Sequence, residues 1–280
     1  MRRHIARWMS WWMRLFILSV VVFRFVSAPG WLETPLIAVL FALACVRARG
    51  EPDRAPEVVA APVRGRWTAL NSPGTKVPSH GIRAYGQSHA IDILHPRPPE
   101  APAKVGWGIG MRNPEGFPTF GSPVLAVRDG VVVRAARRQR DHLTRQSWPA
   151  MAYLMFVEGL FREMGGPRFI LGNHVIVDHG DGTYVAYAHL RRGSLLVGVG
   201  DRVQAGQQLG EVGNSGNSSE PHLHVQLMDS PHVTAAAGVP FRWSDIEIVS
   251  GEFDQSYGAK PASGPIEPGL PANGQVFTAG

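Results

Sequence analysis

Two patterns of apolar residues divide this chain into an N-terminal helical part and a longer β part. Residues 15–28 and 31–46 are mostly apolar, and Pro29 and Gly30 separate them, so each run predicts a helix. Each run is shorter than the roughly 20 residues that a straight membrane-spanning helix needs. Two arrangements stay open: a hairpin of two short spans, or one signal-anchor with an interfacial companion. We therefore expect one or two transmembrane helices within a membrane-anchoring region at residues 1–50.

From residue 63 onward, short strand-like runs alternate with Gly, Pro, Asn and Asp. The Asp-Gly pairs at 129–130 and 181–182 stand between β-branched runs, which is a signal for β-hairpins. Between these pairs, residues 137–165 contain a run with the length and apolar spacing of a helix. The pattern predicts a mainly β domain over 63–250 with a helical insertion at about 137–165.

Composition separates the two flanks of this domain from the domain itself. Residues 51–62 are rich in Pro, Ala, Glu and Arg and predict a linker. Residues 251–280 are rich in Gly, Pro, Ala and Ser and predict a flexible tail.

The charge and the cysteine count restrict the partners. The formal net charge of +6 would suit an anionic partner. However, seven arginines lie within the first 49 residues, where they flank the apolar runs, as arginines that orient a membrane protein do. The chain has no recognised nucleic-acid motif, so we expect the membrane and no nucleic acid as a partner. The single Cys45 excludes an intramolecular disulfide and a cysteine-based metal site, and the sequence leaves the oligomeric state open.

The candidate chemistry lies in histidines and one aspartate. His222 and His224 are two residues apart in a strand-like run, so both point to one face, about 6.6–6.8 Å apart. His189 ends a predicted strand. Asp92 stands between two isoleucines, and a buried carboxylate there needs a metal ion or an arginine as its partner. Three His and Asp ligands with an open position are the usual arrangement of catalytic zinc.

At this point the sequence resembles the lysostaphin/LytM-type zinc metallopeptidases, a family of peptidoglycan endopeptidases with a duplicated hybrid motif. The resemblance covers residues 63–243. It rests on GSPVLAVRDGVVV, GNHVIVDHGDGTYVAYAHL, VGDRVQAGQQLGEVGNSGNSSEPHLH and the aspartate of SHAID. It implies two packed antiparallel sheets with a groove for a peptide stem or crossbridge. It also implies that Asp92 and His224 are zinc ligands and that His189 and His222 are the catalytic residues beside them.

The third ligand departs from the family pattern, which is His-x-x-x-Asp. Ser88 stands four residues before Asp92, and His89 would face away from it on a strand unless a bulge re-aims its side chain. His80 lies in a turn-forming loop before that strand, in a local pattern that resembles a membrane-anchored branch of the family. We therefore predict His80 as the third ligand, ahead of His89 and His95.

The residues and the resemblance together predict a function. We expect a zinc metalloendopeptidase that hydrolyses amide bonds in peptidoglycan peptides, held at the cell membrane with its catalytic domain on the extracytoplasmic side. The alternative is a catalytically degenerate, membrane-tethered module that binds wall or regulates an amidase.

Overall fold

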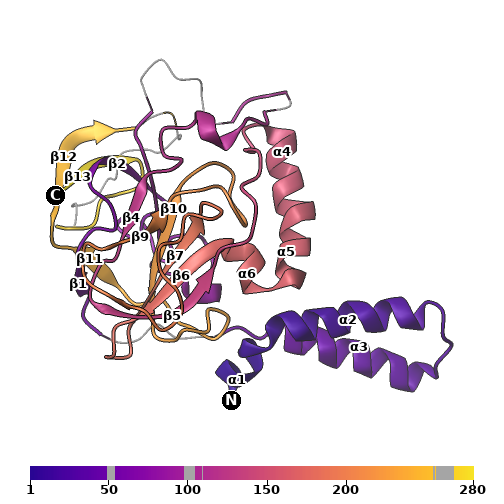
Figure 1. Ribbon diagram of the computed structural model, residues 1–280. Helices are drawn as coiled ribbons and strands as arrows, with labels where there is room; N and C mark the ends of the chain where they lie inside the picture. The colour runs from indigo at the N-terminus through magenta and orange to yellow at the C-terminus, as the bar shows by residue number, and fades with distance from the viewer. Residues whose placement is uncertain (49–53, 98–104, 109, 255, 257–267) are drawn as a thin grey trace.

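A computed structural model of the chain describes residues 1–48, 54–97, 105–108, 110–254, 256 and 268–280. Figure 1 shows a β domain with helices along one side and a helical hairpin at the N-terminus that extends away from it. The N-terminal helices are α1 (Arg2–Arg7), α2 (Met9–Phe23) and α3 (Gly30–Ala44). Helices α2 and α3 pack against each other, and the rings of Phe16 and Phe41 lie 5.3 Å apart.

The hairpin helices are short. Each of α2 and α3 has 15 residues; α2 already ends at Phe23, and the extended backbone at Pro29 directly precedes α3. Such a helix is about 22 Å long, whereas the hydrocarbon core of a bilayer is about 30 Å thick. Within the described ranges, no helix combines the length and the apolar character needed to cross a membrane. The predicted transmembrane helices, and with them the membrane as a partner, are therefore not supported; residues 49 and 50 of the predicted anchor lie outside the described residues.

The described strands form one large antiparallel sheet and two small sheets. The large sheet has nine strands in the order β12-β13-β2-β3-β10-β7-β6-β5-β8. Their bounds are β2 (Gly65–Leu70), β3 (Ile91–Leu94), β5 (Gly130–Ala136), β6 (Asn173–Asp178), β7 (Tyr184–Leu190), β8 (Arg202–Val203), β10 (Leu223–Met228), β12 (Ile246–Phe253) and β13 (Gln275–Ala279). The small sheets pair β4 (Pro123–Leu125) with β9 (Gln208–Glu211) and β1 (Glu57–Val59) with β11 (Phe241–Trp243).

The mainly β, antiparallel character and the presence of a helical segment are confirmed. The predicted second layer differs, because two small sheets take the place of one antiparallel sheet, and the β1–β11 pair is parallel. Side chains from β1, β4, β9 and β11 join those of the large sheet in one buried cluster, which includes Trp67, Tyr187 and Trp243. The two small sheets therefore complete the core that a second antiparallel sheet was expected to form.

The helical segment comprises α4 (Trp148–Tyr153), a π-helical turn η3 (Leu154–Glu158), α5 (Gly159–Gly165) and α6 (Pro167–Leu171). It begins later than predicted, because the side chain of Ser147 accepts a hydrogen bond from the Ala150 N–H and caps the first turn, with Pro149 in that turn. Two 3-10 turns, η1 (Ala84–Gly86) and η2 (Pro114–Gly116), precede it in the chain. The segment leads directly into β6, on the side of the sheet where Leu171 is buried with Met9.

The C-terminal segment does not match the prediction of a flexible tail. Strand β13 lies between β12 and β2 in the sheet, and Phe277 is fully buried there, 5.3 Å from the Trp243 ring. Hydrogen-bonded neighbours on both sides and burial of an aromatic side chain outweigh the Gly- and Pro-rich composition. Part of the predicted linker is likewise a strand, β1. Residues 51–53 of that linker and 255 and 257–267 of that tail lie outside the described residues.

Alternation along the central strands separates two faces of the large sheet. Ile91, Ile93, Leu223 and Val225 point into the main core. Their neighbours Asp92 and His224 must point to the other face, because successive side chains on a strand alternate. On that other face, residues of β6, β7 and β10 form a second, smaller cluster with Tyr85 and Leu171. The two polar residues therefore lie on the face that the helical segment borders.

Burial of His174 predicts a pH-dependent stability. Its ring is 5% exposed, Nδ1–H donates to the Gly172 carbonyl at 2.8 Å, and burial lowers its pKa to about 4. The unfolded chain, with a histidine pKa near 6.5, binds the extra proton between these values, so stability is full above about pH 6.5 and falls toward pH 4. We expect the free energy of unfolding of the wild-type chain to fall by about 2–3 kcal/mol more than that of His174→Gln between pH 7 and 4.5.

Denaturant unfolding of the full chain in EDTA would measure this difference, with the exposed His4→Gln as the control. If the free energy of unfolding changed with pH in the same way for the wild-type chain and His174→Gln, the pH dependence could not be due to His174.

Candidate metal centre

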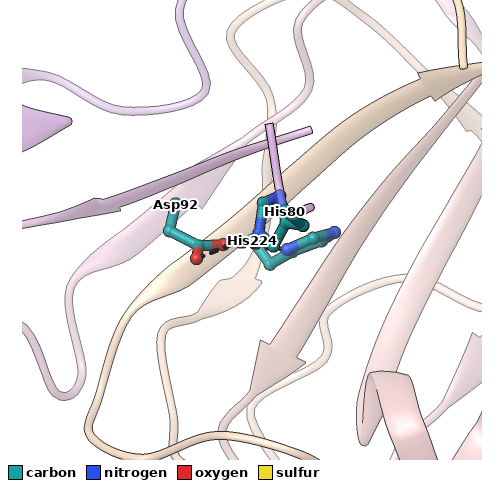
Figure 2. Close-up of side chains that lie close together, drawn as sticks. All are labelled: His80, Asp92 and His224. Carbon is teal, nitrogen blue, oxygen red and sulfur yellow. Dashed lines mark hydrogen bonds and ion pairs between the residues drawn. The ribbon is translucent and has the colours of Figure 1, made fainter. Parts of the chain in front are cut away.

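Three of the predicted residues meet at the β3–β10 ladder. Asp92 on β3 is paired directly with His224 on β10, so both side chains stand on one face. The His224 Nδ1–H donates to Asp92 Oδ1 at 2.8 Å, and His80 Nε2 lies 3.1 Å from Asp92 Oδ2. Figure 2 shows the two rings directed at the carboxylate. One potential ligand atom from each residue lies within 4.8 Å of the other two, which is a group able to hold a metal ion.

His80 reaches this group from a loop rather than from a strand. The loop is tied to the start of β3, because Ser79 N–H donates to the Ser88 carbonyl at 2.9 Å and Ser79 Oγ donates to the Ala90 carbonyl at 2.7 Å. Gly81 follows with a φ of +78°, a left-handed conformation that glycine adopts without strain. These contacts return the chain over β3, so a residue twelve positions before Asp92 lies beside it.

The structure does not bring the two alternative histidines into this group. His89 is half-buried, and its Nδ1 lies 3.4 Å from the neighbouring Ser88 Oγ. His95 stacks on Trp67 with ring centroids 4.0 Å apart, and its Nε2 lies 3.2 Å from Ser122 Oγ. Of the three histidines considered, His80 is the one that lies in the group, and its role as a ligand stays a prediction.

His189 and His222 stand beside the group. Their ring centroids are 4.7 Å apart, His189 is 5.8 Å from the His224 ring, and His222 Nε2 lies 3.6 Å from Asp92 Oδ1. His189 Nδ1–H donates to the Ser215 carbonyl at 2.9 Å, and His222 Nδ1 lies 2.8 Å from the Glu220 carbonyl. A neutral ring that donates from Nδ1 carries its lone pair on Nε2.

The backbone at His189 breaks the alternation of its strand. Val185 and Tyr187 point into the main core, so His189 would follow them in a regular strand. Instead, His189 has a φ of +61°, and the pairing of β6 with β7 shifts between Asn173 and Val175. This irregularity inserts an extra residue on β7 and turns the His189 ring to the opposite face. The φ is uncommon for a residue with a side chain and costs roughly 1–2 kcal/mol.

The surroundings of the site favour the deprotonated form of Asp92 and the neutral form of His189. Burial alone would raise the pKa of Asp92, but the charges of His80 and His222 and hydrogen bonds from His224 and His80 hold it well below its usual range. Burial, together with the neighbouring His222 and His224, lowers the pKa of His189 well below its usual value. Burial opposes protonation of His224, yet its hydrogen bond to Asp92 raises the pKa. The site therefore combines an ionised carboxylate with a neutral His189.

Three further residues support the site and were missed by the sequence reasoning. Gln226 Oε1 accepts from His224 Nε2 at 2.8 Å, and its Nε2 donates to the Tyr85 carbonyl at 2.7 Å. Asn71 Nδ2 donates to Asp92 Oδ2 at 2.8 Å. Gln226 carried a signal, because it stands two residues after His224 on the same strand face. Tyr85 and Asn71 carried none, since loop contacts and positive φ values place them.

Comparison with known proteins agrees with this geometry. Residues 157–235 match the family model of Peptidase family M23. This segment includes His189, His222 and His224, whereas His80 and Asp92 precede it. The chain is 34% identical over 101 residues to the cell division protein DipM of Caulobacter vibrioides, which covers 36% of this chain and 16% of that protein.

Two endopeptidases are also similar. The peptidoglycan DD-endopeptidase ShyA of Vibrio cholerae is 40% identical over 57 residues, which is 20% of this chain and 13% of that protein. The glycyl-glycine endopeptidase ALE-1 of Staphylococcus capitis is 32% identical over 128 residues, 45% of this chain and 27% of that protein. The chain thus spans about a quarter or less of the length of these relatives. Together with the family match, they support a peptidase M23 domain in this part of the chain.

The donor set fits a divalent metal ion. Two imidazoles and one carboxylate come from a loop and two paired strands, and the carboxylate is buried, so a cation would compensate its charge. Gln226 and Asn71 hydrogen-bond to two of the three candidate ligands, as outer residues at metal sites commonly do.

Metal content should distinguish His80 from His89. We expect about one metal ion per chain in the wild-type protein and in His89→Ala, because His89 lies outside the group. His80→Ala removes one of three ligands and should weaken binding at least about 100-fold. Elemental analysis after dialysis would measure the stoichiometry. Retention of metal by His80→Ala with loss in His89→Ala would reverse the assignment.

Proposed function

We propose that this protein is a zinc-dependent endopeptidase that hydrolyses amide bonds in peptidoglycan peptides. The observation that carries the proposal is the convergence of His80, Asp92 and His224 with two further histidines on one face of the sheet. The M23 match and the endopeptidase relatives support a metallopeptidase that acts on cell wall. They do not favour a catalytically degenerate module. We place the reaction on the extracytoplasmic side, where that substrate lies.

His80, Asp92 and His224 would hold the zinc ion, since nitrogen and oxygen donors of this kind suit zinc and three protein ligands leave a position open. When bound, zinc supplies Lewis-acid polarisation of a carbonyl oxygen and makes water more acidic. His224 is fixed for its task by Gln226, which occupies Nε2 and leaves Nδ1 directed at Asp92. Asn71 holds the Asp92 carboxylate by donating a hydrogen bond to its Oδ2 atom.

The two remaining histidines would move the proton. His189 is neutral, and its Nδ1–H bond to Ser215 leaves the Nε2 lone pair to accept a proton from water. His222, whose Nε2 lies 3.6 Å from an Asp92 oxygen, is placed to hold the negative charge that develops on the substrate carbonyl when the ring is protonated. Water is added across the amide, so the products are a carboxylate and an amine.

Digestion of purified peptidoglycan would test the proposed function. Incubation with the zinc-loaded full chain should release peptides with new amino and carboxyl ends, detected by chromatography and mass spectrometry. Chelation should abolish this release, and added zinc should restore it. A zinc-loaded chain that releases no new ends from wall of several compositions would refute the proposal.

His189→Ala should separate metal binding from turnover. His189 lies outside the three-residue metal group, so the variant should keep about one zinc per chain. Its kcat should fall about 10²- to 10⁴-fold, because the proton acceptor is lost. Elemental analysis and initial rates on wall peptides would measure the two effects, with His4→Ala as an exposed control. Full turnover in His189→Ala would show that His189 is not the base.

A further inference from the structure

The helical segment from α4 to α5 forms one wall of the cavity that contains the metal group. This cavity has a volume of about 860 Å³ and includes His80, Asp92, His189, His222 and His224. From α4, η3 and α5, the residues that line it are Met151, Leu154, Met155, Phe156, Gly159, Leu160 and Glu163. One side of the site is therefore polar and the other side is almost entirely apolar.

The apolar side chains on this wall are unusually exposed. Phe156 is 76% exposed, Met155 65% and Leu160 50%, although each is large. Exposed apolar side chains that gather beside a pocket of polar groups are typical of a binding surface. Methionine is adaptable in shape, so a wall that includes Met151 and Met155 can fit apolar groups of different form.

The charged residues of the cavity have partners within the protein. Asp92 is surrounded by histidines, Glu220 pairs with Arg97 at 2.5 Å, and Glu163 lies 3.7 Å from Arg47. Charge therefore contributes little to the choice of the group that binds against this wall. Contact with an apolar group is the interaction that the wall offers.

The wall is held in a defined position. Glu158 receives hydrogen bonds from Arg145 at 2.5 Å and from Arg162 at 3.1 Å, and Arg14 of α2 donates to the Met164 carbonyl at 2.7 Å. Residues 154–158 form a π-helical turn, a feature that is often found at functional sites. This turn carries Met155 and Phe156, the two most exposed of the lining residues from the helical segment.

We infer that this wall is a specificity subsite for an apolar side chain next to the scissile amide. The inference rests on the proposed function and names its substrate class: peptides with an apolar residue beside the cleaved bond, cut in preference to glycine-only peptides. The occupant follows from continuity, because the wall and the metal group border the same cavity. Met155 and Phe156 determine the preference, while the histidines and Asp92 carry the reaction.

A series of peptides that differ only in the residue beside the scissile amide would test this subsite. With glycine, alanine and leucine at that position, kcat/KM of the zinc-loaded full chain should rise at least about threefold per added methylene or methyl group. In Phe156→Ser and Met155→Ser, the leucine-to-glycine ratio should fall at least about tenfold, and Phe156→Leu should restore most of it. Phe161→Ser is the matched control, because Phe161 is 64% exposed on the adjoining helix α5 and lies outside the cavity lining.

Peptide binding to the metal-free chain separates this inference from the proposed function. Fluorescence anisotropy in EDTA should show the same order of affinity, leucine above alanine above glycine, and Phe156→Ser should flatten it. Binding with that order but no cleavage by the zinc-loaded chain would refute the proposed function and leave the subsite standing. Cleavage with equal kcat/KM for all three peptides would overturn the subsite alone. A second result would also overturn the subsite. In it, the chain binds anionic phospholipid vesicles, Phe156→Ser and Phe161→Ser lose this binding equally, and the peptide preference is unchanged.

Discussion

The pairing of Asp92 with His224 across β3 and β10 is the contact on which the rest of the site depends. A buried carboxylate is costly unless it is compensated, and here histidines and the Asn71 amide surround it. The pairing also fixes the register of two central strands. A slip of one residue would turn Asp92 into the apolar core and Ile91 or Ile93 out of it, so core packing and site geometry enforce the same register.

Backbone strain is concentrated around this pair. Among the described residues, the non-glycine residues with positive φ are Asn71, Tyr85 and His189, and each contacts the site. Asn71 binds the Asp92 carboxylate, the Tyr85 carbonyl holds Gln226, and His189 turns its own ring into the site. Such conformations persist only where the surrounding structure determines them. The large buried core beneath the sheet supplies that stability, and the site gains fixed positions for its side chains.

The helical segment gives this site its particular surroundings. The strands supply Asp92, His189 and His224, whereas α4 and α5 supply an apolar side that none of the catalytic residues requires. This division has a physical basis: hydrogen-bonded strands hold reacting groups at fixed separations, and a helix laid beside them can vary its exposed side chains without disturbing the ladder. On the proposed function and the inferred subsite, chemistry and selection of the substrate would be carried by different elements.

Local periodicity was enough for some of these features. Alternation placed His222 and His224 on one face, the isoleucines around Asp92 indicated a buried strand, and turn residues predicted the antiparallel β character. Tertiary structure decided the others. His80 lies beside Asp92 because loop hydrogen bonds fold the chain back, and His189 faces the site because a bulge reverses its direction.

The same distinction explains the sequence predictions that differ from the structure. Composition predicted a flexible tail, but β13 gains neighbours on both sides from β2 and β12, which are far away in sequence. Apolar runs predicted transmembrane helices, but α2 and α3 have only 15 residues each. A sequence pattern determines which way a residue faces within a regular strand or helix. Which segments become neighbours depends on contacts between distant residues, and only the folded chain brings those together.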